Sequence, residues 1–329
     1  MVSMKATGRA SGEAPGDGRP LVSVIIVLYN SADYLEACIG SLGSVDYTPL
    51  ELVLVDNGST DGSPVKAREC AREAGLDCVI SLLEGNPGFA AANNHGFTLA
   101  RGEVLLLLNP DTEVFPDAVE ELVGALQVTD AGLAGCKIYY PDRRTLQHAG
   151  GYVRDNGLTM HYGFNEPDEG QYDVISDVPY VTGAALAIRR EMFERAGMLD
   201  TGYRPAYFEE TDLCLRVRRM GYRVLYVPGA RVVHHESVTT GRFTSSYYYL
   251  YHRNRVRYML KNYSLGFLLN RTLPFEARWL EIVPPEEKGR PLEKAYLANI
   301  LNLPLIVLSR LRMERRLGRP RIEDTVSEL

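Results

Sequence analysis

A carboxylate stands directly after an apolar run: the sequence EVLLLL at residues 103–108 is followed by Asn109, Pro110 and Asp111. A hard oxygen donor at the end of a rigid strand is typical of a Mg²⁺ or Mn²⁺ ligand. Mg²⁺ usually takes only one or two protein carboxylates and completes its shell with phosphates and water. One aspartate is therefore enough if a substrate brings a diphosphate. The alternative for Asn, Pro and Asp in succession is an ordinary turn.

Three carboxylates crowd a second segment, where Glu209, Glu210 and Asp212 (the acidic cluster) lie ahead of or inside a predicted helix. Negative charge at the start of a helix stabilises it by about 0.3 to 1 kcal/mol, which is a structural reason for any one of them. Because neighbouring carboxylates also repel one another, the cluster indicates that at least one is kept for chemistry. Asp212 and Arg216 are four residues apart, so they are also placed to form an ion pair.

Two histidines, His234 and His235, follow the apolar segment ARVV at residues 230–233. A histidine at a strand end often does no more than form a hydrogen bond. The functional alternative is an imidazole ligand that completes the metal shell begun by Asp111. Spacing alone does not decide which of the two histidines would serve.

The elements that must position these residues follow an alternating pattern between residues 21 and 140. Short, continuous apolar runs alternate with helical stretches, which predicts a parallel sheet covered by helices on both faces. We expect strands at residues 21–29, 50–55, 78–83, 103–108 and 132–140, and helices at 33–42, 63–74, 89–100 and 116–128. In such a sheet, ligands bind outside the carboxyl ends of the strands.

Each of the first four predicted strands ends in an Asn or Asp. The segments are Tyr29-Asn30, Asp56 to Gly62, Asn86 to Phe89 and Asn109 to Asp111. One shared site explains this better than four separate turns. Asp56 closes a buried strand, and its carboxylate could accept hydrogen bonds from a nucleotide base or ribose. Its structural alternative is to cap the glycine-rich turn that follows.

Glycine-rich phosphate loops are missing from the sequence. A dinucleotide site would show GxGxxG after the first strand, but residues 28–32 contain no glycine, and no Walker A loop is present. The ligand is therefore not held by a glycine-rich cradle. This argues against nicotinamide-dependent enzymes and P-loop kinases.

The composition is that of a globular protein, since 45% of the 329 residues are hydrophobic and 24% are charged. A net charge of −6 gives no support to long-range attraction for nucleic acid, and we expect no nucleic-acid partner. Five cysteines without a CxxC pair indicate reduced thiols in a cytoplasmic protein. No apolar run reaches about 18 residues, the length needed for a membrane-spanning helix.

The C-terminal third carries two basic segments. In residues 242–261, tyrosines alternate with Arg253, Arg255, Arg257 and Lys261. Such mixing can bind nucleic acid. We interpret it instead as an amphipathic helix packed on the preceding domain that offers Arg253 or Arg255 to a diphosphate, with a solvated basic face as the alternative.

Residues 295–319 join a short apolar segment to five arginines. That combination suits an anionic membrane surface, which would place the protein peripherally at the inner face of the cell membrane. The competing interpretation is a helix that forms a homodimer.

Taken together, the motifs over roughly residues 21–262 resemble those of an inverting family 2 glycosyltransferase of the GT-A fold, in its rhamnosyltransferase-like branch. The matching segments are VSVIIVLYN, LVLVDNGSTDGS, NPGFAAANNHG, LLLLNPDTEV, VTGAALAIRREMFERAGMLD, YFEETDLCLRVRRMGYRVLYVP and YLYHRNRVRYML. So many motifs in the family's order make the resemblance specific.

The resemblance implies an α/β fold, the Rossmann-like GT-A arrangement. A mostly parallel central sheet would be flanked by helices and followed by a helical C-terminal extension. We expect a disordered tail at residues 1–20 and a catalytic domain at 21–241. That domain would consist of a nucleotide-binding half (21–140) and an acceptor-binding half (141–241), with the extension at 242–329.

The resemblance also implies a site for a nucleotide-sugar donor, a dTDP- or UDP-sugar. Its residues would be Leu28, Tyr29, Asn30, Asp56, Asn86, Gly88, Asn93, Asn109, Pro110, Asp111, Gly183 and Ala184, to which the interpretation of the basic helix adds Arg253. Asn109 to Asp111 occupy the place of the family's DxD motif, with Asn in its first position. Asp111 and His234 would hold Mg²⁺ or Mn²⁺, and His234 would matter more because the first aspartate is missing.

In the family, the catalytic base is the second acidic residue of a Glu-Asp pair, which corresponds here to Glu210. Glu209 and Asp212 stay alternatives. Gly183 and Ala184 would lie where the donor sugar and a glycan or lipid-linked acceptor meet.

The expected reaction is transfer of a sugar, L-rhamnose from dTDP-rhamnose, by metal-assisted single displacement. A second hypothesis is a catalytically weak sugar-nucleotide-binding protein, because Asn109 and Glu210 stand where aspartates are usual. A third is a nucleotidyltransferase. Such an enzyme would need a basic, glycine-rich segment after the first strand, and none is present there.

Overall fold

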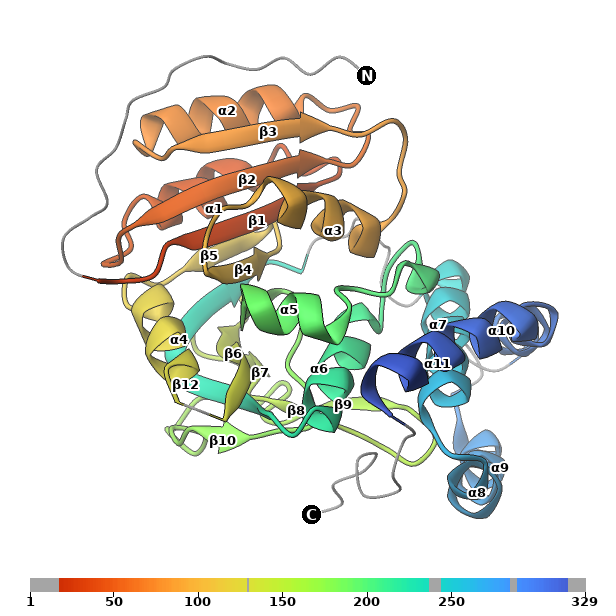
Figure 1. Ribbon diagram of the computed structural model, residues 1–329. Helices are drawn as coiled ribbons and strands as arrows, with labels where there is room; N and C mark the ends of the chain where they lie inside the picture. The colour runs from red at the N-terminus through yellow and green to blue at the C-terminus, as the bar shows by residue number, and fades with distance from the viewer. Residues whose placement is uncertain (1–17, 129, 237–243, 285–288, 319–329) are drawn as a thin grey trace.

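The computed structural model describes residues 18–128, 130–236, 244–284 and 289–318 (Figure 1). Most of the predicted N-terminal tail, residues 1–17, lies outside these ranges. The strands of the main sheet are β1 (Val22–Leu28), β2 (Leu50–Asp56), β3 (Cys78–Leu82), β4 (Val104–Leu108), β5 (Thr112–Val114), β6 (Ala131–Tyr139), β7 (Leu146–His148), β10 (Ser176–Asp177), β11 (Ala185–Arg189) and β12 (Arg223–His234). A separate two-stranded sheet joins β8 (Gly151–Val153) and β9 (Thr159–His161).

The helices lie on both sides of the main sheet and beyond its β6 half (Figure 1). They are α1 (Leu35–Leu42), α2 (Ser63–Glu73), α3 (Phe89–Leu99), α4 (Ala118–Leu126), α5 (Arg190–Ala196), η1 (Thr201–Tyr203), α6 (Glu209–Arg219), α7 (Ser245–Asn262), α8 (Leu265–Phe267), η3 (Leu268–Thr272), α9 (Leu273–Ile282), α10 (Arg290–Leu301) and α11 (Leu303–Leu317). The five strands and four helices predicted between residues 21 and 140 are all present, as β1 to β4 and β6 and as α1 to α4.

The sheet has the strand order β10-β12-β6-β11-β4-β1-β2-β3. β1 runs parallel to both β2 and β4, and β2 runs parallel to β3. β11 lies between β4 and β6 and is antiparallel to both, so β6 points the same way as β4 without touching it. All five predicted strands therefore share a direction, and their carboxyl ends lie toward one edge. The insertion of β11 was not predicted.

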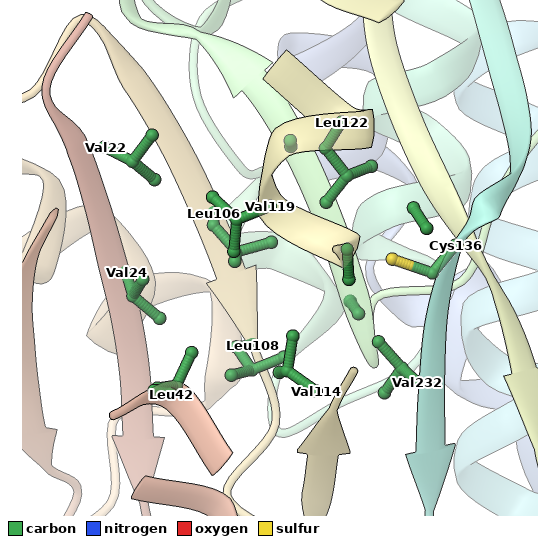
Figure 2. Close-up of a cluster of buried hydrophobic side chains, with 14 of the residues drawn as sticks. Val22, Val24, Leu42, Leu106, Leu108, Val114, Val119, Leu122, Cys136 and Val232 are labelled. Atoms are coloured by element: carbon green, nitrogen blue, oxygen red, sulfur yellow. The ribbon is translucent and has the colours of Figure 1, made fainter. Parts of the chain in front are cut away.

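Both faces of β1 are buried, which explains why its sequence is apolar throughout. Because side chains alternate along a strand, Val22 and Val24 face the α1 and α4 side of the sheet (Figure 2), while Ile25 belongs to the core on the other face. Two packed layers thus hold the central strands rigidly and leave the loops at their carboxyl ends free to carry polar groups.

The C-terminal helices pack on this domain through α7. The helix predicted in this basic, tyrosine-rich segment is present, and Tyr258 and Met259 are buried in the core beneath it. Arg255 is also buried and forms a 2.6 Å ion pair with Glu276 of α9. Its guanidinium is therefore not available to a diphosphate, and the prediction that Arg255 could bind one is wrong. Among the residues that the structure describes, the helices are too short or too polar to cross a bilayer. All five cysteines are free thiols, as predicted.

Candidate functional site

The end of β4 and the end of β12 meet at one point of the sheet edge. β5 pairs with β12 in a register that places Thr112 opposite His234, so the preceding residue, Asp111, lies next to the histidine. His234 Nε2 is 3.3 Å from Asp111 Oδ1, although the two residues are far apart in the sequence. The structure therefore brings together Asp111 and His234, hereafter the metal pair, because these are the two residues predicted from the sequence as metal ligands.

The second ring nitrogen of His234 is held by a residue that was not predicted. Its Nδ1 lies 2.6 Å from Oε1 of Gln147 in β7, which accepts the Nδ1 proton and leaves Nε2 directed at Asp111. Metal-binding histidines are commonly oriented in this way by a partner on the other nitrogen. His235 instead places its Nε2 2.6 Å from Glu113 Oε1, so of the two histidines it is His234 whose ring lies beside the Asp111 carboxylate.

The metal pair offers one hard carboxylate oxygen and one imidazole nitrogen. No group of three or more His, Cys, Asp or Glu side chains in the described ranges is arranged to hold a metal. This pair would thus leave most positions of a divalent cation to the phosphates of a substrate and to water. One carboxylate and one imidazole suit a divalent cation that is bound together with a diphosphate, which is what the single aspartate predicts.

A strained turn sets the start of α6, where the acidic cluster lies. Tyr207 and Phe208 adopt φ values of 81° and 74°, in the left-handed region that costs non-glycine residues about 1 to 3 kcal/mol each. Asn254 of α7 holds this turn, because its Nδ2 donates to the carbonyl oxygens of Ala206 at 2.8 Å and Tyr207 at 3.0 Å. Through Asn254, the C-terminal extension thereby holds the turn that precedes the acidic cluster.

The three carboxylates of the acidic cluster have different surroundings. Burial opposes ionisation of Asp212, but the charges of Lys261 and Arg216 outweigh it and hold its pKa below the usual range. Burial and the charge of Glu210 raise the pKa of Glu209 well above that of an ordinary glutamate.

Burial also raises the pKa of Glu210, whose Oε1 accepts a hydrogen bond from Thr211 Oγ1 at 3.2 Å. Its side chain is only half-buried, and it forms no ion pair with any described residue. Glu210 is therefore the carboxylate of the cluster that is both partly accessible and not engaged by a cation.

Gly183 and Ala184 connect the two ends of the site. The backbone N–H of Asn109 donates to the carbonyl oxygen of Ala184 at 2.8 Å. A Cβ placed on Gly183 would lie 3.6 Å from Cβ and Cγ of Glu210 and 3.7 Å from its Oε2. This glycine thus lies against the Glu210 side chain, and the segment before β11 bridges the end of β4 and the acidic cluster.

A second group of predicted residues lies at the ends of β1 and β2. Leu28 and Asp56 pair as the last residues of these strands, so the segment Leu28–Asn30 runs beside Asp56. The Leu28 side chain is buried, whereas Tyr29 is 39% exposed. The backbone N–H of Ser59 donates to Asp56 Oδ2 at 3.2 Å, so the capping role proposed as the alternative is present as well.

The loop after β3 is tied to the loop after β2. Oδ1 of Asn86 accepts hydrogen bonds from Asn57 Nδ2 at 2.8 Å and from the backbone N–H of Gly88 at 3.0 Å. Asn93, in contrast, is buried in α3, and its Nδ2 donates to the carbonyl oxygen of Phe89 at 3.0 Å. Asn86 and Gly88 therefore lie at the sheet edge, whereas the Asn93 side chain is hydrogen-bonded within its own helix.

The loop after β3 also packs on the loop that leads to the acidic cluster. A Cβ on Gly88 would lie 3.1 Å from the carbonyl oxygen of Pro205. Arg253 of α7 donates to the carbonyl oxygen of Arg204, which places it next to this contact. The loops after β2 and β3 and the loop before α6 are thus in contact with one another, and Asn86, Gly88 and Arg253 lie along these contacts.

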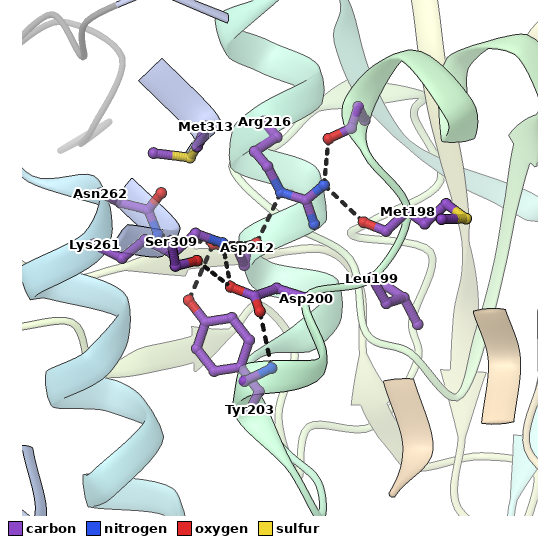
Figure 3. A network of polar contacts seen from close by, with 12 residues as sticks. Met198, Leu199, Asp200, Tyr203, Asp212, Arg216, Lys261, Asn262, Ser309 and Met313 are labelled. Carbon is purple, nitrogen blue, oxygen red and sulfur yellow. Dashed lines mark hydrogen bonds and ion pairs between the residues drawn. The ribbon is translucent and has the colours of Figure 1, made fainter. Parts of the chain in front are cut away.

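A buried network fastens α6 to the C-terminal helices (Figure 3). Lys261 Nζ of α7 lies 2.7 Å from Asp200 Oδ2 and 2.8 Å from both oxygens of Asp212, and the Lys261 side chain is 3% exposed. Ser309 of α11 donates to Asp200 Oδ2 at 3.0 Å. Gln147, Asn254 and Lys261 were not predicted to hold the site, and their contacts span 47 to 87 residues without any spacing signal in the sequence.

Replacing Lys261 with methionine should lower the free energy of unfolding by up to about 3 kcal/mol, because it removes the buried cation that Asp200 and Asp212 share and leaves each carboxylate with a single arginine. Urea unfolding measures this loss. Lys66→Met is the matched control, since it removes the exposed 2.9 Å pair with Glu36 and should cause no measurable change. Equal stability of Lys261→Met and the parent chain would show that the network does not hold α6.

The chain is similar to a known protein family and to solved structures. The family model described as "Glycosyl transferase family 2" matches residues 23–197, more than half of the chain. The structure is similar to a crystal structure of GalNAc-T7 with UDP, GalNAc and Mn²⁺, with a TM-score of 0.66, 18% identity and coverage of 94% of this chain and 56% of that one. This likeness confirms the predicted GT-A fold.

Three curated relatives are similar to this chain over more than two thirds of its length. An uncharacterized protein, y4gI, of Sinorhizobium fredii is 35% identical over 69% of this chain, and the O-antigen biosynthesis protein RfbC of Myxococcus xanthus is 32% identical over 68% of it. This chain spans only 26% and 18% of their lengths. An N-acetylglucosaminyl-diphospho-decaprenol L-rhamnosyltransferase of Mycobacterium tuberculosis is 28% identical over 74% of this chain and 85% of its own.

The resemblance seen in the motifs is therefore confirmed by a match that runs from β1 into the Gly197 turn after α5 and includes the end of β4 and the Gly183 bridge. The chain belongs to glycosyl transferase family 2.

Proposed function

We propose that this glycosyltransferase moves L-rhamnose from dTDP-rhamnose to a glycan or lipid-linked acceptor, with inversion, by a single displacement. The observation that carries the proposal is the bridge between the two ends of the site. The backbone of Asn109 is hydrogen-bonded to Ala184, and Gly183 lies against Glu210. A diphosphate held at the metal pair and an acceptor hydroxyl held at Glu210 would therefore both lie next to the segment before β11.

The donor sugar and the acceptor are inferred from relatives. The Mycobacterium tuberculosis protein is named as a rhamnosyltransferase that acts on a diphospho-decaprenol, and it aligns along most of its own length. The Myxococcus xanthus protein is named for O-antigen biosynthesis. Both names support a role in building a cell-surface polysaccharide.

In this proposal the nucleotide lies at the ends of β1 and β2. Asp56 and the segment Leu28–Asn30 would receive the base and ribose through carboxylate and backbone hydrogen bonds. Asn86 and Gly88 would close this pocket from the loop after β3, with the buried Asn93 supporting them. Arg253 of α7 would approach next to the loop that leads to α6.

The diphosphate would lie at Asn109, Pro110 and the metal pair. Asp111 and His234 would hold Mg²⁺ or Mn²⁺, and the GalNAc-T7 structure with UDP and Mn²⁺ supports such a cation. A divalent cation bound there would offset the negative charge that grows on the departing diphosphate. With Asn at position 109, Asp111 is the only carboxylate of the motif.

Glu210 would act as the general base. It takes the proton of the acceptor hydroxyl while that oxygen attacks the anomeric carbon, and the bond from that carbon to the diphosphate breaks with its electron pair on the leaving group. A raised pKa makes Glu210 a stronger base than an ordinary glutamate. Glu209 is less suited because its side chain is buried away from an acceptor, and Asp212 is less suited because Lys261 and Arg216 engage it.

A catalytically weak sugar-nucleotide-binding protein is the second candidate, favoured by Asn109 in place of an aspartate. A donor screen that monitors nucleoside diphosphate release separates the two functions. We expect release from dTDP-rhamnose that stops when EDTA removes divalent cations and returns when Mn²⁺ or Mg²⁺ is added. Donor binding by calorimetry without release under any metal condition would favour the second candidate.

A further inference from the structure

The outward side of α10 and α11 is apolar over much of its length. Leu297 and Leu301 of α10 and Leu308 and Leu311 of α11 are exposed, hereafter the outer face. Leu301 is 72% exposed and Leu308 is 43% exposed. A protein in water usually avoids grouping large apolar side chains on one surface, and such groups mark sites of association with a partner or a membrane.

The helical period shows that these side chains lie away from the protein. Ala295 and Asn299 of α10 and Ile306 and Met313 of α11 are buried, and both helices contact α7. In α11, Leu308 and Leu311 fall on the side opposite the buried Ile306, at the spacing of one helix face. Asn302 separates the two helices, and α10 extends from α7 to the right-hand edge of the molecule in Figure 1.

Cations border the outer face at both ends. Arg290 and Lys294 precede its apolar residues on α10, and Arg312 and Arg315 follow them on α11; all four are exposed. None of the four forms a hydrogen bond or an ion pair with another described residue. Their charges are therefore available to a partner.

Charge in this region is opposite to that of the chain as a whole. Residues 290–317 contain six Lys and Arg against two Glu, in a protein whose net charge is −6. One of the two, Glu314, is already paired with Arg310 at 2.8 Å. A partner that matches this surface must be apolar at its centre and negatively charged around it.

We propose that the outer face docks on the surface of a bilayer that contains anionic phospholipids. The leucines would enter the boundary between headgroups and acyl chains, and the bordering cations would bind lipid phosphates. A second copy of this chain fits less well, because a two-fold interface through this face would bring the same cations together. The proposal goes beyond sugar transfer and does not depend on it.

Flotation of the full chain with vesicles tests the docking. With vesicles of phosphatidylcholine and about one third phosphatidylglycerol, we expect the protein to float, and with phosphatidylcholine alone we expect most of it to stay at the bottom. Arg312→Gln with Arg315→Gln should weaken binding to the anionic vesicles roughly thirtyfold, from the contribution expected of two cations near such a surface.

The apolar part is tested by Leu301→Glu combined with Leu308→Glu, for which we expect at least a tenfold loss of the floating fraction. Val65→Glu with Val128→Glu is the matched control, because these valines are 65% and 45% exposed and lie on α2 and just after α4. The control should float like the parent chain. Circular dichroism of each variant verifies that the helices are retained.

Three outcomes would overturn the proposal. The parent chain fails to float with anionic vesicles, both leucine and valine variants float equally, or the leucine variant changes only the molar mass measured by light scattering. The last result would identify the outer face as a contact between copies of the chain. Nucleoside diphosphate release, measured separately, distinguishes these failures from a failure of the proposed activity.

Discussion

Replacing Asp111 with asparagine is expected to abolish the metal-dependent release of nucleoside diphosphate while leaving the protein folded. The amide keeps the shape of the side chain but removes its negative charge. Because position 109 is already asparagine, no second carboxylate of the motif can compensate, and His234 alone would face the diphosphate. Release of the diphosphate from the nucleotide sugar, followed over a range of Mn²⁺ concentrations, measures the effect.

The opposite change, Asn109→Asp, serves as the comparison. It adds a second carboxylate next to the metal pair and should strengthen binding of Mn²⁺ in the presence of the donor, as measured by calorimetry. Urea unfolding of Asp111→Asn verifies that the loss is not one of stability. If Asp111→Asn kept full metal-dependent turnover, Asn109 to Asp111 would be only a polar turn.

Replacing Glu210 with glutamine should lower kcat by about 10² to 10⁴, the usual contribution of general base catalysis. Glutamine cannot accept the proton of the acceptor hydroxyl, but it preserves the size of the side chain beside Gly183. Affinity for the donor should therefore be retained, which calorimetry with the nucleotide sugar can verify. Single-turnover release of the diphosphate in the presence of acceptor measures the chemical step.

The pH dependence of kcat/KM gives an independent check on Glu210. A base must be deprotonated to act, and burial raises the pKa of Glu210. The activity of the parent chain should therefore fall on the acidic side at a pH above about 4.3, the ordinary glutamate value, and Glu210→Gln should lack this acidic limb. Glu209→Gln should cost less than Glu210→Gln, since the Glu209 side chain is only 1% exposed and is not open to an acceptor hydroxyl. A Glu210→Gln enzyme of normal activity would contradict the assignment.

The sequence by itself determined most of the framework. Apolar runs such as Val22–Leu28 and Val104–Leu108 are buried on both faces, so their composition alone indicates central strands of a parallel sheet. Because the carboxyl ends of such strands share an edge, the sequence also predicted that Asp56, Asn86 and Asp111 would belong to one region. Their roles toward a donor stay predictions.

Only the tertiary structure decided which side chains meet. His234 and His235 are equivalent by spacing, but the pairing of β12 with β5 turns the first toward Asp111 and the second toward Glu113. The register sets the backbone of Asp111 beside His235, whose N–H donates to the Asp111 carbonyl oxygen at 2.9 Å, so the directions of the side chains just past the strand ends bring His234, and not His235, to the Asp111 carboxylate.

The three carboxylates of the acidic cluster are likewise distinguished only by the tertiary structure. Its three carboxylates look alike in the sequence, yet Asp212 is ionised by Lys261 and Arg216, Glu209 is buried, and Glu210 is left accessible. Lys261 reaches the cluster from α7, 49 residues further along the chain. Local patterns determine helices and strands because they depend on neighbouring residues. The ionisation of a carboxylate depends on whatever charge and solvent the fold brings to it, and that is set by packing between distant segments.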